Sequence, residues 1–188
     1  MGSIRVATTS DVHELAVSVS PLPLLARYGQ TASRLEQALG AALVRGDGIL
    51  VYDDGKLRGF AWYLSSGTFG AGAYLKLLAV SPEAQRSGIG AALLCGYESA
   101  AFATSAHAFL LVSDFNLEAQ RFYQRHGYRH VGALPAFVLP DVSELIYWKP
   151  RQPVVSQAAR EFASSPDPAK PVVHSLESSG ETSRETLG

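Results

Sequence analysis

Cysteine and long apolar runs are both scarce in this sequence. One cysteine among 188 residues cannot form an internal disulfide, which suits a reducing compartment. No apolar run approaches the roughly 20 residues that a membrane-spanning helix needs, and the N-terminus has no charged start followed by a long apolar segment. We therefore expect a cytoplasmic protein with no membrane partner.

The sequence also has no large excess of charge of either sign. Sixteen Lys and Arg residues stand against 17 Asp and Glu, so no basic surplus points to a nucleic-acid partner. The five histidines are scattered, and none pairs with another at helical ligand spacing beside a carboxylate, so no metal site is expected. A G-x-S-x-G nucleophile elbow is missing too, which argues against a serine hydrolase.

What is present suits one globular domain followed by a tail. The hydrophobic fraction is 47%, enough for a sizeable core, and we place the domain at residues 3–149. Residues 150–188 are rich in Pro, Ser and Thr and have one aromatic residue, Phe162, so they cannot bury enough apolar area to offset their ordering entropy. We expect a disordered tail, with a short helix at 156–163 as its one candidate element. Cys95, in an apolar helix, is expected to be a small core residue.

The pattern of apolar residues predicts alternating strands and helices. Strands are expected at 4–7, 48–52, 57–64, 73–80, 108–112, 128–131 and 144–148, and helices from Thr31, at 89–103 and at 116–126. Residues 18–30 are expected to be irregular and 65–72 to form a turn. In the last strand, Leu145 and Tyr147 alternate with Ile146 and Trp148, so either face can be the buried one.

A glycine loop joins the 73–80 strand to the next helix and contains Gly88 and Gly90. Two glycines at a helix start let several backbone N–H groups point at one place, where the helix dipole adds partial positive charge. This predicts an anion site, most plausibly for phosphate. The dinucleotide pattern fails because Leu93 stands at its third small position, and no G-K-[ST] follows.

Two motifs resemble the GNAT N-acetyltransferase family. The loop residues Gln85, Gly88 and Gly90 fit the family's pyrophosphate-binding signature. Downstream, the family spacing is matched by Asn116, Ala119, Phe122, Tyr123, Gly127 and Tyr128. The resemblance covers residues 3–149 and implies a mixed α/β fold, with a largely antiparallel sheet flanked by helices.

The resemblance also implies acetyl-CoA as the acyl donor and an amine as the acceptor. Transfer of the acetyl group would proceed by direct attack in a ternary complex. In family terms the coenzyme would be bound by the backbone N–H groups of Ser87, Gly88, Ile89, Gly90 and Ala91, by Arg86 and Gln85 in the loop, by the backbone of Leu78 and Val80, and by Asn116.

Tyr123 is the candidate general acid. The departing thiolate has a reference thiol pKa of about 8.5, below the tyrosine value of about 10, so a positioned tyrosine can protonate it. The alternative is a core aromatic residue. Asp114 and Glu83 are conceivable bases for the amine, but we nominate neither.

Two other functions stay open. The chain could be a catalytically silent acyl-CoA sensor or interaction module, which would not need the Tyr123 hydroxyl. It could also acetylate a protein, although we expect a small-molecule amine. The region between the first two strands would help form the acceptor side in this family, and homodimers are common in it.

Overall fold

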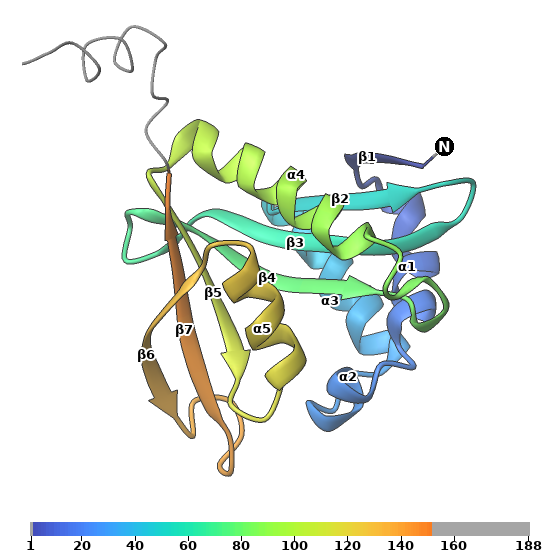
Figure 1. Cartoon of the computed structure of the whole chain (residues 1–188). Coiled ribbons are helices and arrows are strands. Elements are labelled where there is room, and N and C mark those ends of the chain that lie inside the picture. Colours follow the sequence, from blue (N-terminus) through green and yellow to red (C-terminus); the bar gives the residue numbers. More distant parts are fainter. Residues whose placement is uncertain (1, 152–188) are drawn as a thin grey trace, which may run out of the picture. The chain divides into compact units, whose positions relative to one another are not determined.

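Seven strands form one sheet in the computed structural model, which describes residues 2–151 (Figure 1). The sheet order is β1-β2-β3-β4-β5-β7-β6, and every neighbouring pair is antiparallel except β4 and β5. The strands are β1 (Ser3–Val6), β2 (Gly48–Asp53), β3 (Leu57–Thr68), β4 (Gly72–Val80), β5 (His107–Ser113), β6 (Arg129–Pro135) and β7 (Ser143–Pro150).

Helices cover both faces of this sheet. The helical elements are η1 (Thr9–Asp11), α1 (Val12–Val19), α2 (Pro23–Arg27), α3 (Ala32–Arg45), η2 (Pro82–Ala84), α4 (Ile89–Thr104) and α5 (Leu117–Arg125). One core cluster joins α4 and α5 to the sheet, and a second joins α1 and α3 to the opposite face. Figure 1 shows α4 and α5 in front of the sheet with α1 and α3 behind it. The prediction of a mixed α/β fold is confirmed.

Strand β4 has a bulge at its middle and loses one neighbour there. Trp62 of β3 pairs with Leu77 and Tyr63 pairs with Leu75, so Lys76 is the extra residue on β4. On the other side, β4 pairs with β5 only as far as Leu75 and Leu110, although both strands continue. The two strands therefore part at the centre of the sheet.

The segment 18–30 was expected to be irregular, and this was wrong. Helix α1 continues to Val19, and α2 follows at Pro23–Arg27. Pro23 lies in the first turn of α2, where a missing N–H costs no intrahelical hydrogen bond. Pro23, which suggested an irregular segment, therefore starts a helix.

Two further expectations were wrong. The segment 65–72 is not all turn, because β3 continues to Thr68, which pairs with Gly72 beyond an irregularity in the ladder. Cys95 is exposed. Helix α4 turns Leu93, Leu94 and Tyr97 toward the sheet. Cys95 lies between them in the sequence but on the opposite side of the helix, so its side chain faces solvent.

Strand β7 directs Leu145 and Tyr147 to the α4 and α5 side, where Tyr147 is buried. Glu144 and Ile146 therefore project from the other face, since successive side chains on a strand alternate. Nearly all of the expected tail, including 156–163, lies outside the described residues. Among the residues that the structure describes, no helix has the length and apolarity for a membrane crossing.

Asp11 ties the start of the helical region to the edge of the sheet. Its carboxylate accepts hydrogen bonds from Arg5 at 2.8 and 2.9 Å and from the Thr8 N–H at 2.7 Å. The Arg5 guanidinium and this N–H hold the pKa of the carboxyl well below its usual range.

We expect Asp11→Asn to lower the free energy of unfolding by about 1–3 kcal/mol near neutral pH. Because the folded pKa is depressed, the stabilisation is present above the ordinary aspartate pKa of about 3.9 and is lost as pH falls below it. Denaturant unfolding at several pH values should show the gap between variant and parent closing in acid. Asp141→Asn, at an exposed ion pair with Arg27, is the control and should cost about 0.5 kcal/mol or less. A gap that does not depend on pH would contradict this account.

Candidate functional site

A cavity of about 400 Å³ lies where β4 and β5 part. Its lining includes Asn116 and Tyr123 from the α5 side of the sheet and Glu144 from the other side. Leu78 of β4 and Leu111 of β5 also line it. Because residues from both faces contribute, the cavity passes through the sheet between the two strands. Groups that enter from opposite faces can meet there.

The glycine loop has a strained backbone and unpaired amides. Arg86 and Gly88 both have positive φ, +63° and +87°, a backbone conformation that residues other than glycine rarely adopt. Gly88 caps α4, and the first amide with an acceptor is Ala92, which donates to the Gly88 carbonyl at 3.1 Å. Within residues 2–151, none of the N–H groups from Ser87 to Ala91 has a hydrogen-bond acceptor. Such a group of amides at a helix N-terminus suits an anion.

The loop side chains contribute less than its backbone. Gln85 and Arg86 are exposed, and their side chains form no hydrogen bond with any residue that the structure describes. The Ser87 hydroxyl donates to the Ala84 carbonyl within the loop. Gln85 therefore does not order the loop through a hydrogen bond within the described chain.

The open edge of β4 leads from the cavity toward this loop. Leu78 and Val80 pair with β3 on one side, at Ala61 and Gly59, and have no strand partner on the other. Leu78 lines the cavity, whereas Val80 lies next to Gly90, where an added Cβ would be 3.9 Å from its side chain. The two expected binding positions thus lie on one unpaired strand edge.

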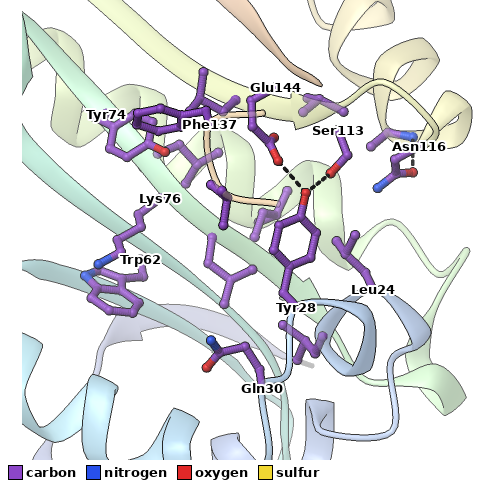
Figure 2. A pocket seen from close by; sticks show the side chains of 18 of the residues that line it. Leu24, Tyr28, Gln30, Trp62, Tyr74, Lys76, Ser113, Asn116, Phe137 and Glu144 are labelled. Carbon is purple, nitrogen blue, oxygen red and sulfur yellow. Dashed lines mark hydrogen bonds between the residues drawn. The ribbon is translucent and has the colours of Figure 1, made fainter. Parts of the chain in front are cut away.

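Asn116 caps α5 and still keeps polar atoms free. Its Oδ1 accepts a hydrogen bond from the Ala119 N–H at 3.2 Å (Figure 2). The Nδ2 group donates to no acceptor within the described residues, and Asn116 lines the cavity. The cap and a ligand contact can therefore use different atoms of one side chain.

Tyr123 lines the cavity from α5 and is only 8% exposed. Its ring contacts Phe122 and Tyr128 edge-on, but its hydroxyl has no hydrogen-bond partner among residues 2–151. Burial, together with nearby Tyr74, raises the pKa of this hydroxyl, so it stays protonated at neutral pH. A protonated hydroxyl that no protein group uses is suited to donate to a ligand.

Three polar groups on the opposite face were missed by sequence reasoning. Ser113 and Glu144 face each other across the β5–β7 ladder, and both side chains reach the hydroxyl of Tyr28, the residue that ends α2 (Figure 2). Tyr28 donates to Glu144 Oε1, so Ser113 Oγ, 2.7 Å away, donates to the tyrosine oxygen. One signal was available, since Glu144 is an acid at the start of an apolar strand.

Glu144 influences the tyrosines around it. Burial and the hydrogen bond to Glu144 raise the pKa of Tyr28. Burial and the charge of Glu144 raise the pKa of Tyr74 to about 12. Asp114 and Glu83 have other contacts, because Asp114 accepts from the Ser143 N–H at 3.1 Å and Glu83 pairs with Arg58 at 3.5 Å. Neither of them lines the cavity.

The sequence was compared with known protein families. The profile of the acetyltransferase (GNAT) family matches residues 13–128, which is more than half of the chain. The match includes both the glycine loop and the Asn116 to Tyr128 motif. A search of curated proteins found no match.

Solved structures share the fold at low sequence identity. A GNAT-family acetyltransferase from Bacillus cereus has a TM-score of 0.66 at 18% identity, covering 81% of this chain and 99% of its own. An N-acetyltransferase from Staphylococcus aureus has 0.65 at 17%, covering 81% and 99%. A ribosomal-protein-alanine N-acetyltransferase from Brucella melitensis has 0.62 at 20%, covering 79% and 99%. At these identities the similarity concerns the fold.

Replacing Glu144 with Gln should make Tyr28 and Tyr74 easier to ionise. The Glu144 charge raises the pKa of both hydroxyls, so its removal lowers them toward the ordinary value, while burial keeps them above it. Ultraviolet difference titration should show tyrosinate appearing at lower pH in Glu144→Gln, within the range where circular dichroism stays native. Glu118→Gln, an exposed acid on α5, is the control. Superimposable curves for parent and Glu144→Gln would rule out the electrostatic coupling.

Proposed function

Because the chain belongs to the acetyltransferase (GNAT) family, we propose that it transfers the acetyl group of acetyl-CoA to an amine by direct attack in a ternary complex. The observation that carries this proposal is the parting of β4 from β5 directly before a loop of unpaired amides. An extended amide-bearing arm can pair with the free β4 edge as a strand would. The pyrophosphate at the end of that arm suits the N–H groups of Ser87 to Ala91.

The remaining coenzyme contacts follow from the same geometry. Asn116 Nδ2 is free to donate to an arm carbonyl, and Leu78 offers an apolar wall beside the strand edge. Arg86 is exposed in the loop and can add a charged contact to phosphate. These groups lie at the loop and at the cavity, and the open β4 edge lies between them.

Tyr123 acts as general acid in this proposal. The lone pair of the neutral amine forms the new bond to the thioester carbonyl carbon, and the bonding pair of the broken carbon–sulfur bond leaves with sulfur. Tyr123 donates its proton to that sulfur and regains one from the amine nitrogen, so that an amide and a free thiol result. Its raised pKa keeps the proton in place until the thiolate develops.

The acceptor side favours a small molecule over a protein. Helix α2 and the segment between β6 and β7 both line the cavity, through Leu24 and Phe137. Arg27 at the end of α2 forms an ion pair with Asp141 of the β6–β7 segment, with 3.2 Å between the guanidinium nitrogen and the carboxylate oxygen. The Arg27 guanidinium also stacks over the Phe115 ring, 4.0 Å from its centre. These contacts narrow the space that a polypeptide acceptor would need.

A silent acyl-CoA sensor is the second candidate, and Tyr123 weighs against it. Binding alone needs the loop and the β4 edge. The Tyr123 hydroxyl makes no structural hydrogen bond in the described chain, so a pure binding module would have no use for it and phenylalanine would serve as well.

Gly88→Asp should abolish acetyl-CoA binding in calorimetric titration, because its carboxylate occupies the anion position. Gly46→Asp is a matched control, since Gly46 also has a positive φ, +80°, and also has no atom within 4 Å of an added Cβ, but caps α3. It should bind acetyl-CoA as the parent does. Gly88→Asn places an uncharged side chain of the same size at this position, so the difference between Gly88→Asp and Gly88→Asn measures the effect of the charge apart from that of the backbone conformation. A parent protein that does not bind acetyl-CoA would contradict the proposal.

Tyr123→Phe should lower kcat by about 10²- to 10⁴-fold with the best amine of a panel, assayed by thiol release. Acetyl-CoA affinity should be unchanged, because the ring remains. Tyr128→Phe is the control, since that hydroxyl is buried, has no partner in the described chain and does not line the cavity. Unchanged turnover by Tyr123→Phe would remove Tyr123 as the acid.

A further inference from the structure

Glu144 is a buried carboxylate that no cation accompanies. It is 5% exposed, and within residues 2–151 no Lys, Arg or His lies within ion-pair distance of it. Its side chain accepts one hydrogen bond from the described residues, from Tyr28, although a carboxylate has about four acceptor positions. Buried charges are normally paired. Glu144 lines the cavity, so its free acceptor positions are available to a ligand there.

The surroundings of Glu144 are otherwise mostly apolar. It is the only carboxylate among the cavity residues that the structure describes, and Lys76 is the only cation. Lys76 Nζ lies 4.0 Å from the centre of the Trp62 ring, and Figure 2 shows its side chain directed at Trp62. The acceptor side of the lining is supplied by leucines and aromatic residues, among them Leu24, Leu25 and Leu35.

We propose that Glu144 binds the ammonium group of the acceptor, and that the acceptor class is a primary amine on an apolar body. This deepens the proposed function and rests on it. The bound ammonium releases one proton to water before the neutral amine attacks the thioester. An ammonium group has three donors and a full charge, so it fits a carboxylate with open acceptor positions. The apolar lining accommodates the rest of such a molecule.

A divalent cation fits the site less well. Calcium and magnesium take six or more oxygen ligands, whereas one carboxylate is present here and no group of three potential metal-ligating residues occurs in the part of the chain that the structure describes. An acidic acceptor is disfavoured by repulsion from the same carboxylate. The single negative charge in an apolar cavity therefore selects for an organic cation.

Tyr28 has a positioning role in this proposal. Its hydroxyl, held by Ser113, donates to Glu144 Oε1 and fixes one oxygen of the carboxylate. The other oxygen, Oε2, accepts no hydrogen bond from the described residues and is available to the ammonium. Loss of the Tyr28 hydroxyl should therefore leave the charge of Glu144, and with it the preference for a cation.

The test compares two probes of equal size, phenethylamine and phenethyl alcohol, by calorimetric titration of the full chain without any thioester. The parent should bind the amine at least about tenfold more tightly than the alcohol, and Glu144→Gln should bind both alike. Glu98→Gln removes a half-buried acid that pairs with Lys149 outside the cavity, and it should keep the parent's preference. Tyr28→Phe should keep it as well.

Three outcomes would overturn the proposal. They are no binding of either probe by the parent, an amine preference that survives Glu144→Gln, and a loss of preference in Tyr28→Phe equal to that in Glu144→Gln. An equal loss in the two variants would mean that Glu144 acts only by holding Tyr28 in place and does not itself bind the ammonium. A parallel titration with acetyl-CoA separates the two levels: an amine preference without acetyl-CoA binding would refute the acetyltransferase proposal and leave the cation site standing.

Discussion

The parting of β4 and β5 after Leu75 is the constraint on which the rest of this structure depends. A central strand normally pairs on both sides, because unpaired backbone groups inside a protein are costly. Here the bulge at Lys76 and the loss of β5 as a neighbour occur at the same place in β4. The result is a passage through the sheet that no side chain of the described residues fills.

The glycine loop adds a second local cost next to the first. The positive φ of Arg86, a residue other than glycine, and a run of amides without acceptors would be unfavourable in a purely structural turn. Strain of this kind persists where the surrounding structure holds it and where a ligand can use it. The site thus combines an open strand edge with an open helix N-terminus, and both are satisfied by one extended anionic molecule.

The two faces of the sheet divide the chemistry. The groups suited to the acyl donor, such as Asn116 and Tyr123, lie on the side of α4 and α5. Glu144 and Tyr28 lie on the other side, where α2 and α3 help to line the cavity. Helix placement produces most of this division, since α5 covers one face of the sheet, and strand alternation along β7 directs Glu144 to the other. An acceptor and a donor can then approach each other through the gap from opposite directions.

The sequence by itself determined elements whose causes are local: the order of the seven strands, the helices that follow Thr31, Gly88 and Asn116, and the loop whose glycines permit positive φ. It also carried the two motifs, because each lies within a few consecutive residues. Tertiary structure alone decided that Cys95 is exposed, that β7 turns Glu144 into the cavity, and that Glu144 meets Tyr28, 116 residues away. Such contacts depend on strand register and helix placement, which are set by the sum of many distant packing contacts. No window of neighbouring residues encodes that sum.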